Sequence, residues 1–267
     1  MADALGVWRR LVGAQIRSQL QYRASFALDV AGAFLISFLD FFAILIVFHN
    51  VPRLGTWNVH QVALLYAISM ISFALTDLVI GHLDLLPQKV RDGTFDLVLV
   101  RPRSTLLQIA ALDFQLRRLG KAVQGAIVLA YALSGAGIHW TAARVLMLVL
   151  TIPVGIVIFG AVWVAGSCIA FWTVDGGEFT NAFTYGGNFL TEYPVDLYSR
   201  WARRLLAYVV PLAFVAYFPA LYILGKPDPL GLPRALEFSG PAAAAAACVG
   251  AAATWRFAVR RYRSAGG

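Results

Sequence analysis

Residues 61–104 read QVALLYAISMISFALTDLVIGHLDLLPQKVRDGTFDLVLVRPRS. The first half is an apolar run of the length that a membrane-spanning helix needs, which is about 20 residues. The second half is charged and turn-prone: Gly93 permits a tight turn, and Pro102 ends the short apolar stretch 95–100. The alternation predicts a membrane helix followed by a compact, structured loop. The alternative is a solvated charged loop that only sets the topology.

The rest of the chain repeats this apolar character. Its 267 residues are 60% hydrophobic and 13% charged, with a mean hydropathy of +0.71, whereas soluble domains are about 25% charged. The sequence therefore predicts an all-α, polytopic membrane protein that forms one transmembrane domain over 1–267. Six apolar runs are long enough to span, namely 25–49, 61–82, 118–138, 145–172, 205–224 and 240–258.

The Lys and Arg residues are distributed unevenly between the loops. With the N-terminus inside the cell, 18 of the 22 fall on the cytoplasmic side, and four fall outside: Arg53, Arg144, Lys226 and Arg234. Because cytoplasmic loops are enriched in Lys and Arg, both termini are predicted to be cytoplasmic. The net charge of +8 then reflects loops beside anionic lipid and not a nucleic-acid partner.

Three segments outside the spans have their own character. Residues 1–23 are basic and amphipathic, which is typical of a helix lying in the membrane interface. Residues 83–117 form a long basic cytoplasmic loop. Residues 173–204 are open to two interpretations, a cytoplasmic interfacial helix or a re-entrant segment.

Catalytic and metal-binding motifs are missing from the sequence. It has no G-x-x-x-x-G-K-[ST] phosphate loop, no H-E-x-x-H and no C-x-x-C. Cys168 and Cys248 lie in apolar runs and are predicted to pack, and the four histidines lie near predicted membrane boundaries. We predict no catalytic residue, no metal site and no cofactor in this chain. If ATP drives the protein, another chain must hydrolyse it.

Three acidic residues fall inside predicted spans, where a charge is costly and often functional. Asp29 and Asp40 are eleven residues apart and share one face of the first span, and Asp77 lies in the second. We predict that they face a translocation path or a subunit interface. The alternative is a carboxyl group that is locked between helices.

Three motifs occur in order along the chain. The first is G-x-x-D-x-x-L-x-R-P, and the others are Y-P-x-x-x-[YF] and P-x-A-F-x-x-[YF]-x-P. With the predicted topology, this order resembles the permease subunits of type-2 ABC exporters, in particular a bacterial subgroup with paired permeases and a separate ATPase. The matching residues are Gly93, Asp96, Leu99, Arg101 and Pro102; Tyr193, Pro194 and Tyr198; and Pro211, Ala213, Phe214, Tyr217 and Pro219.

The resemblance implies partners that the sequence itself does not show. Two permeases, identical or homologous, would associate with two copies of an ABC ATPase that binds ATP and Mg. A coupling helix within 84–101 would dock on that ATPase, and the N-terminal interfacial helix would make a second contact. The implied contact residues are Asp84, Gln88, Arg91, Asp92, Gly93, Asp96 and Arg101.

The implied function is efflux of a hydrophobic or amphiphilic substrate, such as a drug, a lipid or a peptide, across a bacterial inner membrane. The first, second and fifth spans would line the route at the permease–permease interface. Two other classes remain open at this stage. One is an ion-coupled secondary transporter, for which an inverted repeat is expected. The other is an intramembrane enzyme or scaffold.

Overall fold

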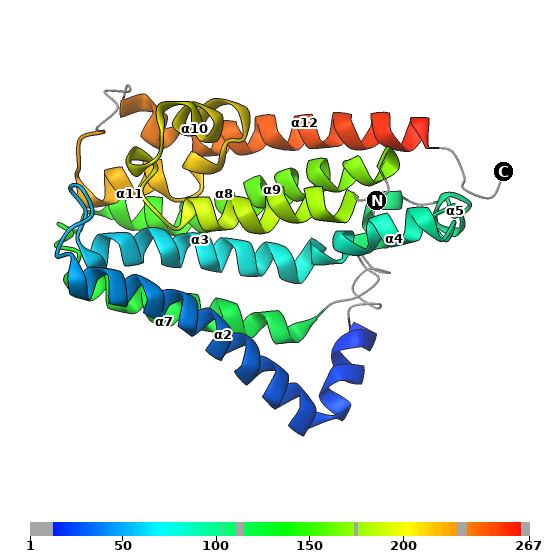
Figure 1. The fold of residues 1–267 in the computed structure, drawn as a ribbon, viewed down its shortest axis with the longest axis horizontal. Coiled ribbons are helices and arrows are strands. Elements are labelled where there is room, and N and C mark those ends of the chain that lie inside the picture. Colours follow the sequence, from blue (N-terminus) through cyan, green and yellow to red (C-terminus); the bar gives the residue numbers. More distant parts are fainter. Residues whose placement is uncertain (1–12, 103, 111–114, 174–175, 229–233, 263–267) are drawn as a thin grey trace.

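A computed structural model describes residues 13–102, 104–110, 115–173, 176–228 and 234–262. Within these ranges the regular structure is helical, and the one strand-like contact is an isolated bridge between Leu54 and Trp57. The all-α prediction is confirmed. The helices lie side by side in one elongated bundle (Figure 1).

Six long helices build the bundle. Four helical stretches in the described ranges are long and apolar enough to span a membrane, and a fifth counts if a bent helix pair near residues 200–224 is one span. The long helices are α2 (Arg23–Asn50), α3 (Val59–Ile80), α7 (Leu119–Gly135), α8 (Ala142–Ser167), α9 (Gly176–Thr191) and α12 (Gly240–Arg261).

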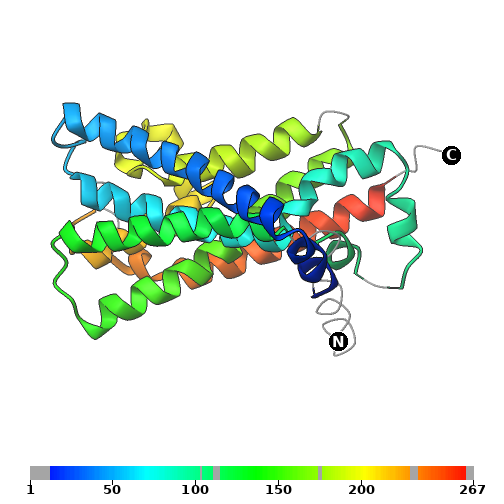
Figure 2. The same ribbon diagram turned by 90° about the horizontal axis from the view of Figure 1, so that it is seen from below.

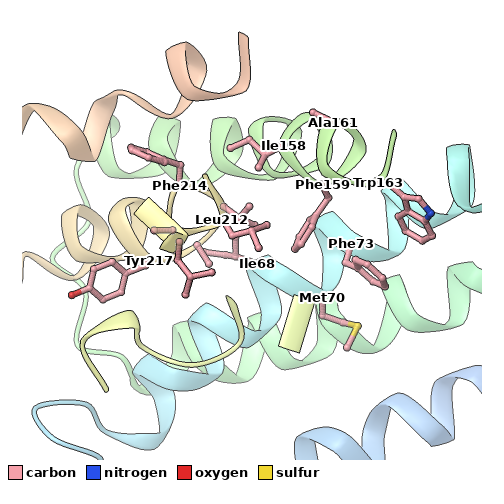
Figure 3. Packing of buried hydrophobic residues seen from close by; sticks show 14 of the residues in the cluster. Ile68, Met70, Phe73, Ile158, Phe159, Ala161, Trp163, Leu212, Phe214 and Tyr217 are labelled. Carbon is pink, nitrogen blue, oxygen red and sulfur yellow. The ribbon is translucent and has the colours of Figure 1, made fainter. Parts of the chain in front are cut away.

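Helix α3 is the centre of the bundle. Figure 1 shows α2 and α7 on one side of it and α8, α9 and α12 on the other. It is predominantly apolar, and 16 of its 22 residues are buried, as expected for a core helix. Its Phe73 ring lies 5.4 Å from the rings of both Phe159 and Trp163 on α8, a packing that Figure 3 shows.

Helix α2 is held against α7 by a close backbone approach. A Cβ atom on Gly120 would lie 2.4 Å from the carbonyl oxygen of Val30, so only glycine fits there. Figure 2 shows α2 crossing the bundle obliquely. Only Ser37, Phe41 and Ile44 of this helix are buried, so most of its apolar surface faces lipid or another chain.

The region 200–224 is not one straight helix. The segments Arg200–Ala207 and Leu212–Leu224 are bent by 73° relative to each other. Pro211 lies at the break and has no backbone N–H to continue a helix. The span predicted over 205–224 is therefore broken, and the bent pair is either one broken span or a re-entrant loop. Its parts are α10 (Arg200–Arg204), a π-helical turn (Leu205–Val209), a 3-10 turn (Leu212–Phe214) and α11 (Tyr217–Leu224).

Residues 176–204 run the length of the bundle. Gly177, at the start of α9, lies against Pro87, while beyond its other end the carboxylate of Asp196 accepts a hydrogen bond of 3.0 Å from Trp57. Trp57 lies in the loop between α2 and α3, at the far end from Pro87. Asp196 thus lies at the end of the bundle opposite to α4. This position does not fit a cytoplasmic interfacial helix, and it leaves the re-entrant alternative open.

Helix α9 is too polar to resemble a span in the sequence. Its Thr180 and Thr184 hydroxyls donate to the carbonyl oxygens of Gly176 and Thr180, at 2.8 and 2.9 Å, and both threonines are buried. Such bonds to the preceding turn satisfy the hydroxyl groups within the helix itself. Helices α3 and α8 shelter this polar face.

Short helices complete the chain. Residues 13–21 are helical, and the side-chain oxygen of Gln19 accepts a 2.9 Å hydrogen bond from the backbone N–H of Leu116. The sequence predicts an interfacial helix over 1–23, and residues 1–12 of that helix lie outside the described residues. The remaining turns are Gly81–Leu85, α4 (Leu86–Arg91), α5 (Asp96–Leu99), α6 (Thr105–Ala110), Leu116–Arg118, Cys168–Phe171, Val195–Leu197 and Arg234–Phe238.

Candidate functional site

The charged part of residues 61–104 forms a compact hairpin of short helices beyond α3. Helix α4 ends at Arg91, and Gly93 reverses the chain with a φ of +68°, a backbone conformation that strongly favours glycine. Gln108 of α6 then donates a 3.2 Å hydrogen bond from its side-chain amide to the carbonyl oxygen of Val98. We call residues 84–101 the coupling segment from here on.

One face of the coupling segment is anchored in the bundle by Phe95. This ring is fully buried, and its centroid lies 5.1 Å from that of Phe171 and 5.0 Å from that of Tyr262, both in edge-to-face geometry. Phe171 follows α8 and Tyr262 follows α12. The ring contacts therefore join the segment to the ends of two long helices through close packing.

Asp84 provides a second anchor on the same face. Its carboxylate accepts a 2.8 Å hydrogen bond from the indole N–H of Trp163 on α8 and a 3.2 Å bond from the hydroxyl of Tyr185 on α9. The sequence analysis placed Asp84 among the residues that contact a partner. The structure instead directs its carboxylate toward the bundle.

The other face of the coupling segment is open. Leu97 is 66% exposed and Val100 is 83% exposed, although both are apolar and lie outside the long helices. Four predicted contact residues are also exposed, namely Gln88, Arg91, Asp92 and Arg101, while Gly93 and Asp96 are half-buried. Apolar side chains at the centre of a charged rim are typical of a protein-binding surface.

The three acids predicted in the spans are not brought together. Asp77 is buried and forms a 3.0 Å ion pair with Arg118 at the start of α7, and Arg118 also donates to the backbone carbonyl of Asp77. This arrangement corresponds to the locked-carboxyl alternative. Asp29 and Asp40 are exposed on α2, which is compatible with a path or an interface.

A separate polar cluster closes the opposite end of the bundle. The indole of the fully buried Trp57 donates to both carboxylate oxygens of Asp196, at 3.0 and 3.2 Å, and the ammonium of Lys226 lies 4.3 Å from the Trp57 ring centroid. Burial lowers the pKa of Lys226, and the nearby Asp196 carboxylate partly opposes this shift. The cluster fixes the bent segment 200–224 to the loop between α2 and α3.

Sequence reasoning missed several residues that the structure makes prominent. Three of them, Phe95, Trp163 and Arg118, make contacts with residues that are distant in the sequence. A fourth, Glu192, directly precedes the Tyr193-Pro194 motif. A charge inside an apolar run marks Asp29, Asp40 and Asp77, whereas Glu192 follows a polar stretch and carries no such signal. In the described part of the chain, no group of three or more His, Cys, Asp or Glu side chains is placed to hold a metal ion.

Comparison with known proteins identifies the family. Residues 34–266 match the family described as ABC-2 family transporter protein. No curated protein and no solved structure matched the chain. The match includes every long helix except the start of α2, and it includes the whole coupling segment. The chain therefore belongs to the ABC-2 transporter family and is a membrane component of that class of transporter.

Proposed function

We propose that the chain is the permease subunit of an ATP-driven exporter and that a separate ABC ATPase drives it through the coupling segment. The observation that carries this proposal is the division of the segment into two faces. Leu97 and Val100 point outward, while Phe95 is packed against the ends of α8 and α12. The chain has no phosphate loop of its own, so the outward face needs an energy-supplying partner.

We also propose six membrane crossings, in a revised arrangement. These are α2, α3, α7, α8, α9 and α12, and segment 200–224 enters and leaves at the end opposite to the coupling segment. The contact of Asp196 with Trp57 supports α9 as the fifth crossing, and so does the bond from the Lys226 ammonium to the carbonyl oxygen of Thr56 at 2.6 Å. The protein then lies in a bacterial inner membrane, with both termini and the coupling segment on the cytoplasmic side.

A second permease, identical or homologous, completes the transporter in this proposal, together with two ATPase copies that hold ATP and Mg. The exposed sides of α2 and α9 would meet that second permease and border the export route. Helix α3 contributes little lining surface because most of its residues are buried within the chain. The substrate is hydrophobic or amphiphilic in this proposal, because the exposed sides of α2 and α9 carry large apolar side chains, such as Phe183 and Phe189 of α9.

Substitution of Gly93 by Ala tests the coupling segment. A side chain at a φ of +68° costs about 1–2 kcal/mol, and the segment relieves this strain by leaving its docking geometry. We expect the purified chain to recover about 5- to 30-fold less ATPase from its native membranes. The measurement is the amount of co-purified ATPase per permease, together with its rate of ATP hydrolysis in nanodiscs.

Gly137→Ala is the matched control. Gly137 also has a φ of +68° and also has open space around it, but it lies in the loop between α7 and α8, at the other end of the bundle. The control carries the same backbone strain and is expected to recover ATPase like the wild type. Equal recovery with both variants at wild-type levels would contradict the proposal.

A further inference from the structure

A cavity of about 300 Å³ lies among α2, α3, α7 and α9, separate from the coupling segment. Its lining contains two carboxyl groups and one amino group from three elements, Asp40 on α2, Glu192 after α9 and Lys121 on α7. Charged groups at membrane depth are expensive and usually serve a function. Two carboxyl groups and one ammonium line the cavity, and a cation bound beside the carboxyl groups would favour their ionised forms.

The outer part of this cavity is built rigidly. Glu192 is 6% exposed, and one of its carboxylate oxygens accepts a 2.8 Å hydrogen bond from the side-chain amide of Asn188. The amide oxygen of Asn188 accepts a 3.1 Å bond from the hydroxyl of Ser69 on α3, and Thr191 contacts the same hydroxyl. This buried network orients Glu192, as second-layer hydrogen bonds do in preorganised sites.

Aromatic rings supply the remaining walls. Phe73, Tyr185, Phe189 and Tyr193 all line the cavity, and Figure 3 shows Met70, another lining residue, extending from α3 on the side away from α8. The Lys121 ammonium lies 6.0 Å from the centroid of the Tyr185 ring. Phe189 and Tyr193 belong to the part of the lining that contains Glu192. Ring faces attract organic cations, and apolar walls suit their hydrocarbon parts.

We propose that this cavity binds a small amphiphilic cation, an aromatic or alkyl ammonium compound, with its charge between Asp40 and Glu192. The aromatic rings among the polar groups of the lining favour an organic cation over a hydrated metal ion, and the two carboxyl groups disfavour an anion. The role of this cavity as a site for exported substrate rests on the proposed function. Its volume is at the lower limit for ligand pockets, which restricts the ligand to a compact cationic part.

Ethidium, a fluorescent aromatic cation, is the probe. The full-length chain is placed in nanodiscs of zwitterionic lipid, and ethidium anisotropy is measured with empty nanodiscs as background. We expect Asp40→Asn and Glu192→Gln each to weaken binding about tenfold. Glu192→Asp keeps the charge and is expected to recover part of the affinity. The anionic dye 8-anilinonaphthalene-1-sulfonate should show no such loss.

Two further variants make the result decisive. Glu178→Gln removes an exposed carboxyl group of α9 that lies outside the cavity, and this variant should bind ethidium like the wild type. Lys121→Met removes a positive charge that repels the ethidium cation. It should therefore strengthen ethidium binding, a gain that misfolding cannot produce. Wild-type affinity in both acid variants, an equal loss in Glu178→Gln, or weaker binding in Lys121→Met would overturn the proposal.

The experiment contains neither ATP nor an ATPase, so it can fail independently of the proposed function. Gly93→Ala should bind ethidium normally even though it recovers less ATPase. Normal ATPase recovery without ethidium binding would show that the exported substrate belongs to another chemical class. Ethidium binding without ATPase recovery would leave the cavity assigned and the ATP-driven mechanism rejected.

Discussion

Replacing Leu97 and Val100 together by Asp is expected to abolish recovery of the partner ATPase with the purified chain. The two side chains are 66% and 83% exposed in the isolated chain, so the substitutions should leave its folding almost unchanged. In a docked complex they would lie at the centre of the interface. Anchors of this kind contribute about 2 kcal/mol each, so affinity should fall by about 10³-fold.

Val51→Asp is the control for this double variant. Val51 is also apolar and 43% exposed, but it follows α2 at the end opposite to the coupling segment. We expect the control to recover ATPase like the wild type, and both variants to elute as folded protein in size-exclusion chromatography. Undiminished ATPase recovery with the double variant would show that the exposed apolar tip is not the docking surface.

Arg118→Met is expected to lower the free energy of unfolding by about 3–5 kcal/mol, because it leaves the Asp77 carboxylate buried without its partner. The two side chains are 13% and 3% exposed, and their atoms are 3.0 Å apart. The pair joins α3 to the start of α7. Thermal unfolding in detergent micelles, followed by circular dichroism, measures the loss.

Two variants separate the ion pair from a general effect of charge. Arg117→Met removes the exposed neighbouring arginine and should cost less than about 1 kcal/mol. The double variant Asp77→Leu with Arg118→Met should recover most of the loss, since apolar pairs often replace buried ion pairs without cost. If Arg118→Met costs no more than Arg117→Met, Asp77 is not locked, and its predicted role in the path regains support.

The parts of the fold that could be predicted are those written locally in the sequence. The run around α3 and the turn at Gly93 depend on length, hydropathy and one backbone preference. Helix α9 could not be recognised because its threonine and glycine residues lower its hydropathy. Its place inside the bundle comes from shelter by α3 and α8, which is a tertiary effect.

The orientation count shows the same limit. Arg200, Arg203 and Arg204 were among the 18 residues placed on the cytoplasmic side, yet they follow Asp196, which bonds to Trp57 at the opposite end. The remaining asymmetry still favours cytoplasmic termini. The bend at Pro211 decides on which side these three arginines lie, and its 73° angle is a tertiary feature that the sequence does not show.

The candidate sites were predictable only as a list of residue types. The exposed members of the coupling segment, such as Arg91 and Arg101, were among the residues predicted to contact a partner. The anchoring role of Phe95 was not predictable, because Phe171 and Tyr262 are distant in sequence. Glu192 was missed for a similar reason: its cavity requires α2, α7 and α9 to be brought together.

Photocrosslinking from position 97 tests most directly whether a separate ATPase docks on the coupling segment. Leu97 is replaced by p-benzoylphenylalanine in cells that carry the native membrane partners, and Val51 is replaced in the same way as a reference at the opposite end. We predict a crosslinked product from position 97, and none from position 51, that contains a chain with an ATP-binding phosphate loop. Crosslinks from position 97 to lipid alone, in membranes where the chain is folded and abundant, would contradict the account.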